Sequence, residues 1–366
     1  MQHDLSFIDK SNLKWLKDNT IFLTVAGSHS YGTNIATSDI DYRGIAIAPK
    51  NYYFTFNNKF EQAEFKDPDC VIFDIRKFFA LAVNNNPNCI EIIFTDPKDH
   101  LIVNPIMKKL FDHRYDFLCK RARYSYEGYA FAQFKRIRLH NNYLRNPIDH
   151  KPTRKEFGLP EHTVISKEQL EAVSAMMRKK LDSWTVDLSQ LDNNTRIELS
   201  ENVTNVMTEI CAASIFLEKE TLWKEAAVSC NINPNFVFLI QKEKEYEAKA
   251  KEYKQYQDWK KNRNVLRADL EAEFGFDCKH ALHLVRLTRQ CKEILKDGEL
   301  IVKRPDAKEL VDIRNGAWTY DDLCKWFDEQ HAEIKELYEK SNLQYTNNKE
   351  MLDNICQEII EEFLSK

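Results

Sequence analysis

Residues 25–45, VAGSHSYGTNIATSDIDYRGI, decide the fold of this chain. A short β-branched and apolar run over residues 21–26 leads into the dipeptide Gly27-Ser28, and residues 40–48 alternate apolar with polar or small side chains. Both runs are typical of strands, and the glycine between them permits a tight turn. The stretch therefore predicts two strands, with a turn directly after the first.

Asp39 and Asp41 stand at the start of the second strand. Side chains two residues apart on a strand share one face, so these carboxylates repel each other unless a cation lies between them. The usual cation for an all-oxygen site is Mg²⁺, which takes phosphate oxygens as further ligands. Gly27 lets the backbone approach a phosphate, the amides after it can point at the anion, and Ser28 and Ser30 add hydroxyl donors. The joint pattern predicts a triphosphate and metal site, although each element alone is more typical of ordinary structure.

The composition restricts the class of protein. With 366 residues, of which 43% are hydrophobic and 30% charged, the chain is typical of a soluble globular protein. No apolar run approaches the roughly 18 residues of a membrane-spanning helix, and the N-terminus lacks the pattern of a secretory signal. The nine cysteines are scattered without a CxxC pair, which predicts reduced thiols in the cytoplasm and gives almost no support to a zinc site.

The pattern along the chain predicts an α+β protein in two parts. Residues 1–112 alternate strand and helix runs, with a third short strand at 70–73, and form the expected catalytic domain. Strand signals largely disappear in residues 113–366, an expected helical domain in which residues 166–272 form a helical insert without an assigned role. Runs with helical spacing cover residues 75–83, 88–94, 124–143, 167–184, 195–217, 220–229, 241–264, 279–296, 307–315 and 319–340.

Charge is distributed unevenly. The formal net charge is −4, from 53 basic and 57 acidic residues, and by itself does not predict a nucleic-acid binder. Residues 114–155, however, hold 11 Lys or Arg against 3 acidic residues, a local balance of +8, and a polyanion responds to such a local field. Interleaved aromatic residues suit single-stranded nucleic acid, but most have the spacing of a helix core. The candidates for RNA contacts are therefore Lys135, Arg136, Arg138 and Arg145, with a solvated face as an equal alternative.

The spacing of Gly27-Ser28 and the two aspartates resembles the nucleotidyltransferase superfamily related to DNA polymerase beta. More specifically, the chain resembles the RNA repair pathway DNA polymerase beta family over residues 20–165 and 273–335. The segments that carry this resemblance are GSHSYGTNIATSDIDYRGI (27–45), FDIRKFFALAVNNNPNCIEIIF (73–94), RKEFGLP (154–160), KHALHLVRL (279–287), GELIVKRPD (298–306) and IRNG (313–316).

The resemblance implies a mixed-sheet catalytic core that binds two divalent ions, Mg²⁺ or alternatively Mn²⁺. It also implies transfer of a nucleotidyl group from a nucleoside triphosphate, such as ATP, to an acceptor. Asp39 and Asp41 match the paired metal ligands of the family, while Gly27 and Ser28 match its phosphate loop. The third carboxylate, which binds one metal and helps to deprotonate the acceptor hydroxyl, is best matched by Asp74. Its alternatives are an N-cap role for this residue, and Asp69 as the third carboxylate.

A later helix supplies the last predicted contacts. Lys279, His283 and Arg286 follow one another at four- and three-residue spacing, so they form one polar stripe on a helix. Because this segment matches the family, Lys279 and Arg286 are expected to contact the triphosphate or the acceptor. The histidines are expected to be ordinary residues of a packed helix.

The leading hypothesis is a cytoplasmic Mg²⁺-dependent nucleotidyltransferase that moves NMP from an NTP to a hydroxyl, on an RNA end, in RNA or tRNA repair or modification. Membership of the superfamily does not fix the acceptor, so transfer to a protein or small molecule is the first alternative. A catalytically silent nucleic-acid-binding protein is the second, and the intact aspartate pair counts against it.

Overall fold

The computed structural model describes most of the chain and divides it into two compact units. One unit comprises Met1–Asn146 and Asn264–Lys366, and the other comprises residues 147–263. The described residues are 3–166, 168, 169, 171–173, 175, 176, 234–263 and 265–365. The helical runs expected at 195–217 and 220–229, and most of the run at 167–184, lie outside these residues.

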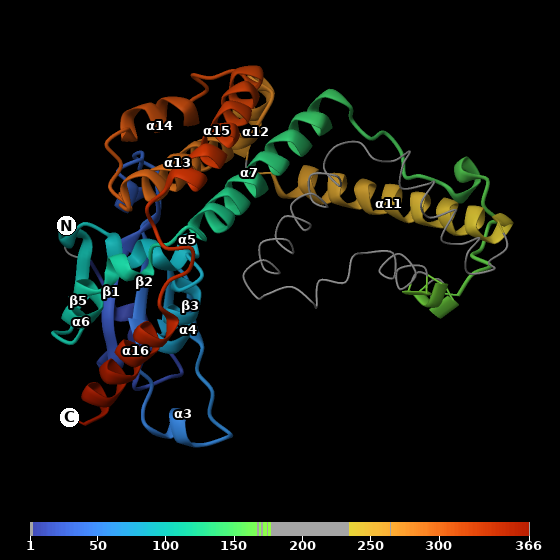
Figure 1. The fold of residues 1–366 in the computed structure, drawn as a ribbon. Coiled ribbons are helices and arrows are strands. Elements are labelled where there is room, and N and C mark those ends of the chain that lie inside the picture. Colours follow the sequence, from blue (N-terminus) through green and yellow to red (C-terminus); the bar gives the residue numbers. More distant parts are fainter. Residues whose placement is uncertain are drawn as a thin grey trace. The chain divides into compact units, whose positions relative to one another are not determined.

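A five-stranded mixed sheet lies at the centre of the first unit (Figure 1). The sheet is formed by β1 (Thr20–Ala26), β2 (Asp41–Ala46), β3 (Gln62–Lys66), β4 (Asp69–Asp74) and β5 (His100–Val103), in the order β3-β4-β2-β1-β5. β1 is antiparallel to β2 and β5, β3 is antiparallel to β4, and β2 is parallel to β4. The prediction of an α+β fold with a mixed sheet and a helical C-terminal region is confirmed, whereas β3 and β5 were not anticipated from the sequence.

The register between β2 and β4 decides which side chains meet. Tyr42 pairs with Cys70 and Ala46 pairs with Asp74, so the two parallel strands begin at the same edge of the sheet. Paired residues of neighbouring strands share a face, and faces alternate along each strand. The residues that begin the two strands therefore project from one edge on one face.

Helices from distant parts of the sequence bury that face. One large apolar cluster unites side chains of β1 and β2 with those of α4 (Ile75–Ala82), α5 (Pro87–Ile90), α6 (Met107–Asp112), α7 (Ala122–Arg145), α13 (Cys278–Asp297) and α16 (Lys349–Leu364). The opposite face is covered by η1 (Ser6–Lys10) and α1 (Leu16–Asn19), which contribute to a smaller cluster. Because α7 and α13 complete the core of the sheet, the expected boundary after residue 112 falls inside the first unit.

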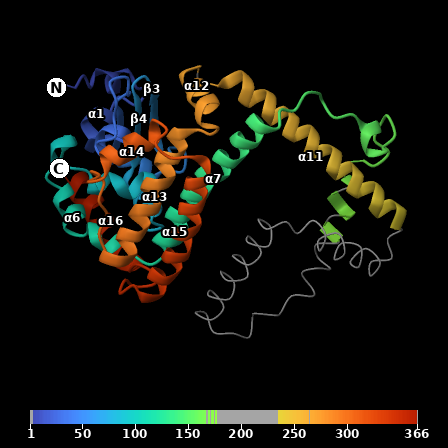
Figure 2. The same cartoon turned by 90° about the horizontal axis from the view of Figure 1, so that it is seen from above.

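The helical half is organised around α13, which packs on α7, α14 (Ala307–Arg314) and α15 (Tyr320–Lys340) (Figure 2). Asp277 caps α13 by accepting the amides of Lys279 and His280, and Gly298 ends the helix with φ +67°. These four helices, predicted from their apolar spacing, lie close to their expected bounds. A further helix, α12 (Val265–Phe274), precedes α13.

Short elements connect the sheet to the helices. They are α2 (Gly27–Tyr31), α3 (Asn51–Phe54), η2 (Glu91–Phe94), η3 (Pro97–Asp99) and η4 (Arg114–Phe117). The single helix expected over 88–94 is instead α5, which begins at Pro87, followed by the tighter turn η2. The side chain of Asn86 accepts the amide of Asn88 and fixes the start of α5.

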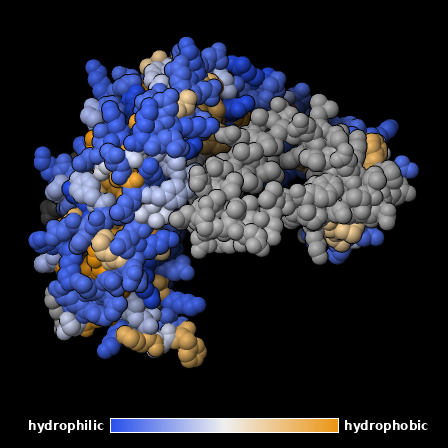
Figure 3. All heavy atoms as spheres, in the orientation of Figure 1, coloured by the Kyte–Doolittle hydropathy of each residue, from blue (hydrophilic) through white to orange (hydrophobic). Residues whose placement is uncertain are grey.

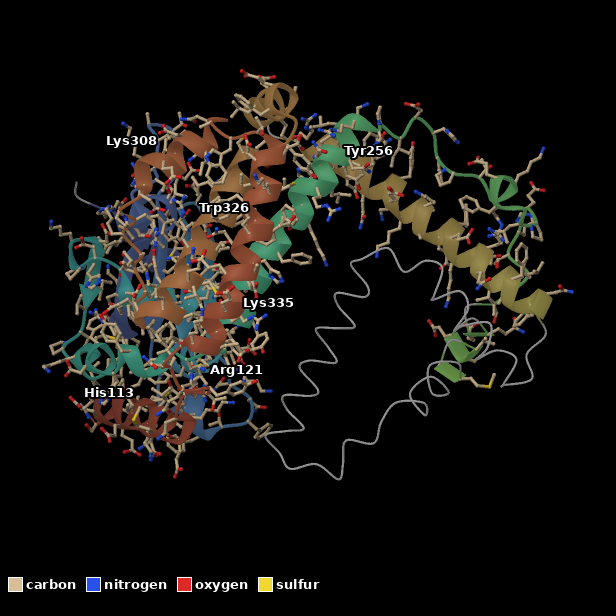
Figure 4. The ribbon with its side chains drawn as sticks, turned by 45° about the horizontal axis from the view of Figure 1, so that its top comes forward. His113, Arg121, Tyr256, Lys308, Trp326 and Lys335 are labelled. Carbon is tan, nitrogen blue, oxygen red and sulfur yellow. The ribbon has the colours of Figure 1, made fainter. Side chains whose placement is uncertain are left out.

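The second unit is described over η5 (Arg154–Phe157) and α11 (Pro234–Asn262), the helix expected at 241–264. Arg154 ties these two elements together, because its Nη1 donates to Glu243 Oε2 at 2.9 Å. Glu243 is buried, as is Tyr256 further along α11 (Figure 4). The charged helix is therefore partly covered rather than fully solvated, and the segment RKEFGLP has a structural role in this unit.

The visible surface is mainly hydrophilic (Figure 3). Exposed Lys308 of α14 and Lys335 of α15 lie on the outer sides of their helices (Figure 4). No helix among the described residues is long and apolar enough to cross a membrane. The seven cysteines within the described ranges are free thiols, as predicted.

Helix α16 was not expected from the sequence, and it provides a test of the core. Leu352 on α16 is fully buried in the large cluster, whereas the adjacent Asp353 is exposed. We expect Leu352→Ala to lower the free energy of unfolding by about 2–5 kcal/mol through lost burial and the cavity left behind. Asp353→Ala should change it by less than about 0.5 kcal/mol. Urea denaturation followed by circular dichroism measures both, and equal effects would contradict the packing of α16.

Candidate active site

A cleft of about 750 Å³ opens in the first unit, at the sheet edge where β1 ends and β2 begins. Its lining combines the aspartate motif with residues from the helical half, several of which lie more than 200 positions later in the sequence. The lining residues that bear on the predicted site are Gly27, Ser28, Ser30, Asp39, Asp41, Arg136, Lys279, His283, Arg286 and Arg314.

Gly27 is required at its position by both conformation and space. It begins α2 with φ +63°, a value that L side chains rarely adopt, and a Cβ there would collide with the carboxylate of Asp41. Ala26 pairs with Asp41 across β1 and β2, which explains the close approach. Ser28 lines the cleft. Ser30 is almost fully buried and its Oγ donates to the carbonyl of Gly27 at 2.9 Å, so this hydroxyl closes the turn.

Asp39 and Asp41 both line the cleft. Asp39 is exposed just before β2, and Asp41 is half-buried at its first position. Burial raises the pKa of Asp41, and the nearby carboxylate of Asp69 raises it further, while Arg43 and Lys279 act in the opposite direction. The ionised carboxylate of Asp41 is thus under-compensated by the protein alone.

Asp74 does not join this pair, which corrects the preferred assignment of the third carboxylate. It ends β4, five residues from the edge where Asp41 lies, a separation of roughly 16 Å along the strand. Its Oδ1 accepts the amide of Arg76 at 2.9 Å and the Nε of the same residue at 2.9 Å. Asp74 is therefore the N-cap of α4, the alternative role considered for it from the sequence.

Asp69, the alternative third carboxylate, lies at the same edge of the sheet as Asp41. It begins β4 as Asp41 begins β2, and the parallel register places the two side by side on one face. Its influence on the pKa of Asp41 reflects this proximity. Asp69 Oδ1 accepts from Nη1 of Arg43 at 3.1 Å, and Arg43 itself lines the cleft. The geometry therefore favours Asp69 over Asp74 as the third acidic residue of the site.

The helical half gives the cleft a cationic wall. Lys279 lies near the start of α13, and together with His283, Arg286 and Arg314 it lines the same cleft as the aspartates. Burial lowers the pKa of His283 well below its usual range, and the neighbouring Arg286 and Lys279 lower it further. The imidazole is therefore neutral at pH 7, and the positive charge of this wall comes from lysine and arginine.

Comparison with known proteins identifies a family for the part of the chain that contains the sheet and the aspartate motif. Residues 2–151 match the model of the RNA repair pathway DNA polymerase beta family. The resemblance is confirmed for this part of the chain. The match indicates a DNA polymerase beta-like nucleotidyltransferase associated with RNA repair, and it includes β1–β5, the aspartate motif and α7.

One curated relative extends over more of the chain. It is an uncharacterized 38.9 kDa protein from the nrdC-mobD intergenic region of Enterobacteria phage T4, 22% identical over 324 residues. The alignment covers 81% of this chain and 83% of that protein, so the helical half is aligned as well as the sheet. A search of solved structures finds no significant match.

Arg286 has a different role from the predicted nucleotide contact, although it lines the cleft. Its Nη1 donates to Glu91 Oε1 at 2.5 Å and to Gln290 Oε1 at 2.8 Å. The guanidinium carbon lies 3.9 Å from the ring centroid of Tyr31, whose hydroxyl donates to Glu91 Oε2 at 2.6 Å. These contacts join α13, η2 and α2, so Arg286 first of all holds the Gly-Ser turn against the helical half.

The four basic residues predicted to contact RNA are all exposed on α7, but only Arg136 lines the cleft. Lys135, Arg138 and Arg145 lie over the rings of Phe131, Phe134 and Tyr320, at 4.9, 5.8 and 5.6 Å from the ring centroids. Of the aromatic residues among these cations, Tyr126 and Phe134 are buried in the large apolar cluster, and Phe131 packs against it.

Sequence reasoning missed several residues of the cleft. Arg43 follows Asp41 at the same two-residue spacing that relates Asp41 to Asp39. This spacing could have indicated that Arg43 shares a strand face with the aspartates. Arg314 and Asn315 belong to the segment IRNG, which carried the family resemblance but was given no role. Glu91 lies in the segment 73–94, and nothing local in the sequence indicates that its partner is Arg286.

The raised pKa of Asp41 predicts a stabilising substitution. A carboxylate whose pKa is higher in the folded than in the unfolded protein costs stability once the pH exceeds its ordinary value of about 3.9. Without divalent cations, we expect Asp41→Asn to raise the melting temperature at pH 7. The rise should be about 2–4 °C for each kcal/mol gained in the free energy of unfolding. The gain should vanish below about pH 4, where the carboxyl group of Asp41 is protonated in both the folded and the unfolded protein. Differential scanning fluorimetry across this pH range measures the effect. Destabilisation at pH 7, or a gain equalled by exposed Asp353→Asn, would contradict it.

The buried pair of Glu91 and Arg286 predicts a large loss when one member is removed. Glu91→Leu leaves the charge of Arg286 without its carboxylate and should cost about 3–5 kcal/mol of the free energy of unfolding. The double variant with Arg286→Met should recover most of this loss. Glu309→Gln, which breaks a half-exposed pair with Arg289, should cost less than about 1 kcal/mol. Urea denaturation tests all three, and similar losses for the two glutamate variants would refute the buried pair's role.

Proposed function

We propose that this protein is a Mg²⁺-dependent nucleotidyltransferase that moves NMP from an NTP to a hydroxyl group at an RNA end. One observation carries the proposal. Asp39 and Asp41 line a cleft beside the Gly27 turn together with Lys279 and Arg314, and Asp69 lies next to Asp41 at the start of the neighbouring strand. Such a cleft complements a metal-bound triphosphate, because the metal compensates the carboxylates and the phosphates compensate the cations.

The carboxylates at this edge of the sheet fit a divalent cation. They offer only carboxylate oxygens, the donors that Mg²⁺ prefers, and Mn²⁺ accepts the same set. The raised pKa of Asp41 indicates carboxylates that lack sufficient positive charge. Asp39, Asp41 and Asp69 are the residues that would hold the metal, which when bound neutralises phosphate charge as the bond to the leaving group breaks.

The chain's own residues would orient the reactants. The Gly27-Ser28 turn lets backbone amides approach the phosphates, and Lys279 brings an ammonium group to the same cleft. The acceptor oxygen bonds to the α-phosphorus, the bond from this phosphorus to the bridging oxygen breaks, and pyrophosphate leaves with the electron pair. Asp69 Oδ2, the oxygen that is not bonded to Arg43, can take the hydroxyl proton.

The basic face of α7 supports RNA as the acceptor. Arg136 lines the cleft, and Lys135, Arg138 and Arg145 continue along the exposed side of the same helix. Exposed cations at this spacing can follow a phosphate backbone beyond the catalytic centre. The family's link to RNA repair points to the same class of acceptor.

Substitution of the four carboxylates separates the proposed roles. Asp39→Asn combined with Asp41→Asn, and Asp69→Asn alone, should lower transfer of labelled NMP to tRNA or nicked RNA by at least about 100-fold, equivalent to about 2.7 kcal/mol. Asp74→Asn keeps an oxygen that can cap α4 and lies outside the cleft lining, so it should retain transfer at a temperature where the variant is folded. Chelation of divalent ions should abolish transfer, and added Mg²⁺ should restore it.

Three outcomes would contradict this proposal. Undiminished transfer by the Asp39 and Asp41 double variant would show that the carboxylates are not catalytic. Loss with Asp74→Asn but not with Asp69→Asn would restore the original assignment of the third carboxylate. Absence of RNA labelling, together with a mass increase of one nucleotide on a protein or small molecule incubated with ATP, would show a different acceptor.

A further inference from the structure

We propose that His29, on α2, is a positioning residue that holds Asp39 in place beside the Gly27 turn. The ring of His29 bonds to the loop that leads to Asp39, and its backbone carbonyl bonds to Lys303, which lies 274 positions later in the sequence. One residue thus joins the glycine turn, the aspartate motif and the helical half. The inference rests on the proposed function, because the position of Asp39 has a chemical consequence only where this carboxylate binds a metal.

The bond from His29 fixes the residue that directly precedes Asp39. His29 Nε2 lies 3.3 Å from the carbonyl oxygen of Ser38. A carbonyl oxygen can only accept a hydrogen bond, so Nε2 carries the proton and donates it. Ser38 also closes a turn with Ile35, because its amide donates to the carbonyl of Ile35 and its Oγ accepts the amide of Ile35, each at 2.9 Å. The loop is therefore a closed turn that one imidazole fastens to α2.

Asp39 depends on this loop because it stands just outside the sheet. The strand pairing of β2 begins at Asp41, which lies opposite Ala26, whereas Asp39 is exposed and precedes the strand. The position of Asp39 relative to the Gly27 turn is thus set by the loop, and by the bond that ties the loop to His29. Mg²⁺ requires ligands close to ideal octahedral geometry, so a small shift of one carboxylate weakens its binding.

The segment GELIVKRPD (298–306), which carried the family resemblance without an assigned role, holds α2 from another side. Lys303 Nζ donates to the carbonyl of His29 at 3.3 Å. The amide of Arg304 donates to the carbonyl of Tyr31 at 3.0 Å. The last carbonyl groups of a helix have no partner within the helix, so these two bonds satisfy groups at the end of α2. The segment therefore fixes the short helix that carries His29.

Arg304 connects this segment to α13. It is buried, and its Nη1 and Nη2 each donate to a carboxylate oxygen of Glu293 on α13 at 2.7 Å. Its Nε donates to Asp306 Oδ1 at 2.8 Å. Such a bidentate pair holds the guanidinium in one orientation. A continuous series of bonds thus leads from α13 through the segment 298–306 to α2, and through the ring of His29 to the residue before Asp39.

Hydrogen exchange tests the bond in the full-length protein without metal or nucleotide. His29→Ala removes the donor to Ser38, so the amides of residues 33–41 should exchange about 2–10-fold faster than in the wild type, as expected for the loss of one hydrogen bond. His29→Gln should restore slow exchange, because Nε2 of glutamine lies close to the place of the imidazole Nε2 and also donates. Mass spectrometry of the peptide that covers this loop measures the rates.

Metal binding tests the consequence for Asp39. In a titration of metal-free protein with Mn²⁺, followed by electron paramagnetic resonance, His29→Ala should bind about 10–100-fold more weakly than the wild type, the usual effect of removing a residue that orients a metal ligand. His29→Gln should bind as the wild type does. The matched control is His113→Ala, which removes another half-buried histidine, bonded to Asp116 at 2.8 Å (Figure 4). It should change neither exchange of the loop nor binding of Mn²⁺.

Nucleotidyl transfer separates positioning from catalysis. His29→Ala should require a correspondingly higher concentration of Mg²⁺, and its kcat at saturating Mg²⁺ should approach that of the wild type. The Asp39 and Asp41 double variant, which lacks two of the proposed ligands, should stay inactive at every Mg²⁺ concentration. A loss of kcat in His29→Ala that saturating Mg²⁺ does not repair would contradict a positioning role.

Two further outcomes would overturn the inference. Unchanged exchange of residues 33–41 in His29→Ala would show that the imidazole does not hold the loop. Equal effects of His29→Ala and His29→Gln would show that the packing of the ring, and not its hydrogen bond, matters. Wild-type protein that binds no Mn²⁺ would instead contradict the proposed function, and faster exchange in His29→Ala alone would then still support the tether. Circular dichroism of each variant confirms that it is folded.

Discussion

The contact between Glu91 and Arg286 is the interaction on which the site depends. Glu91 accepts one hydrogen bond from Arg286 and another from Tyr31, so a single buried carboxylate fastens α13 and α2 to η2. A buried ion pair gives little net stability compared with apolar residues of the same size, because desolvation offsets the attraction. The ion pair instead fixes the position of α2, because Tyr31, which bonds to Glu91, ends the helix that Gly27 begins. The turn at Gly27 and helix α13, which both line the cleft, are therefore held together.

The register of two parallel strands explains both the success and the error of the sequence-based assignment. Asp39 and Asp41 could be identified from the sequence because their relation is local, two residues on one strand. The third carboxylate depends on how β4 lies beside β2, and this relation is invisible locally. Asp74 follows an apolar run and precedes a helix, a pattern that fits an N-cap as well as a ligand. Once the strands are known to be parallel and in register, Asp69 is the residue that meets Asp41.

The same distinction between local and long-range signals applies to the rest of the fold. Helices α7, α13, α14 and α15 could be predicted because each has an apolar stripe with helical spacing. The strands β3 and β5 lie at the two edges of the sheet. Their sequences, QAEFK and HLIV, span only five and four residues, which is too short for a periodic pattern to identify a strand. The role of Arg286 as a partner of Glu91, 195 positions earlier, follows only from the packing of α13 on the core.

The two walls of the cleft show opposite electrostatic deficits. The pKa of Asp41 is raised, which indicates too little positive charge near its carboxylate, whereas the pKa of His283 is lowered by burial and by surrounding cations. A simple anion would compensate only the cations around His283, and a free metal ion would compensate only the carboxylate of Asp41. A metal-bound triphosphate carries positive charge at one end of the contact and negative charge along the other, so it relieves both. This complementarity supports the proposal that the cleft binds a metal–nucleotide complex rather than either component alone.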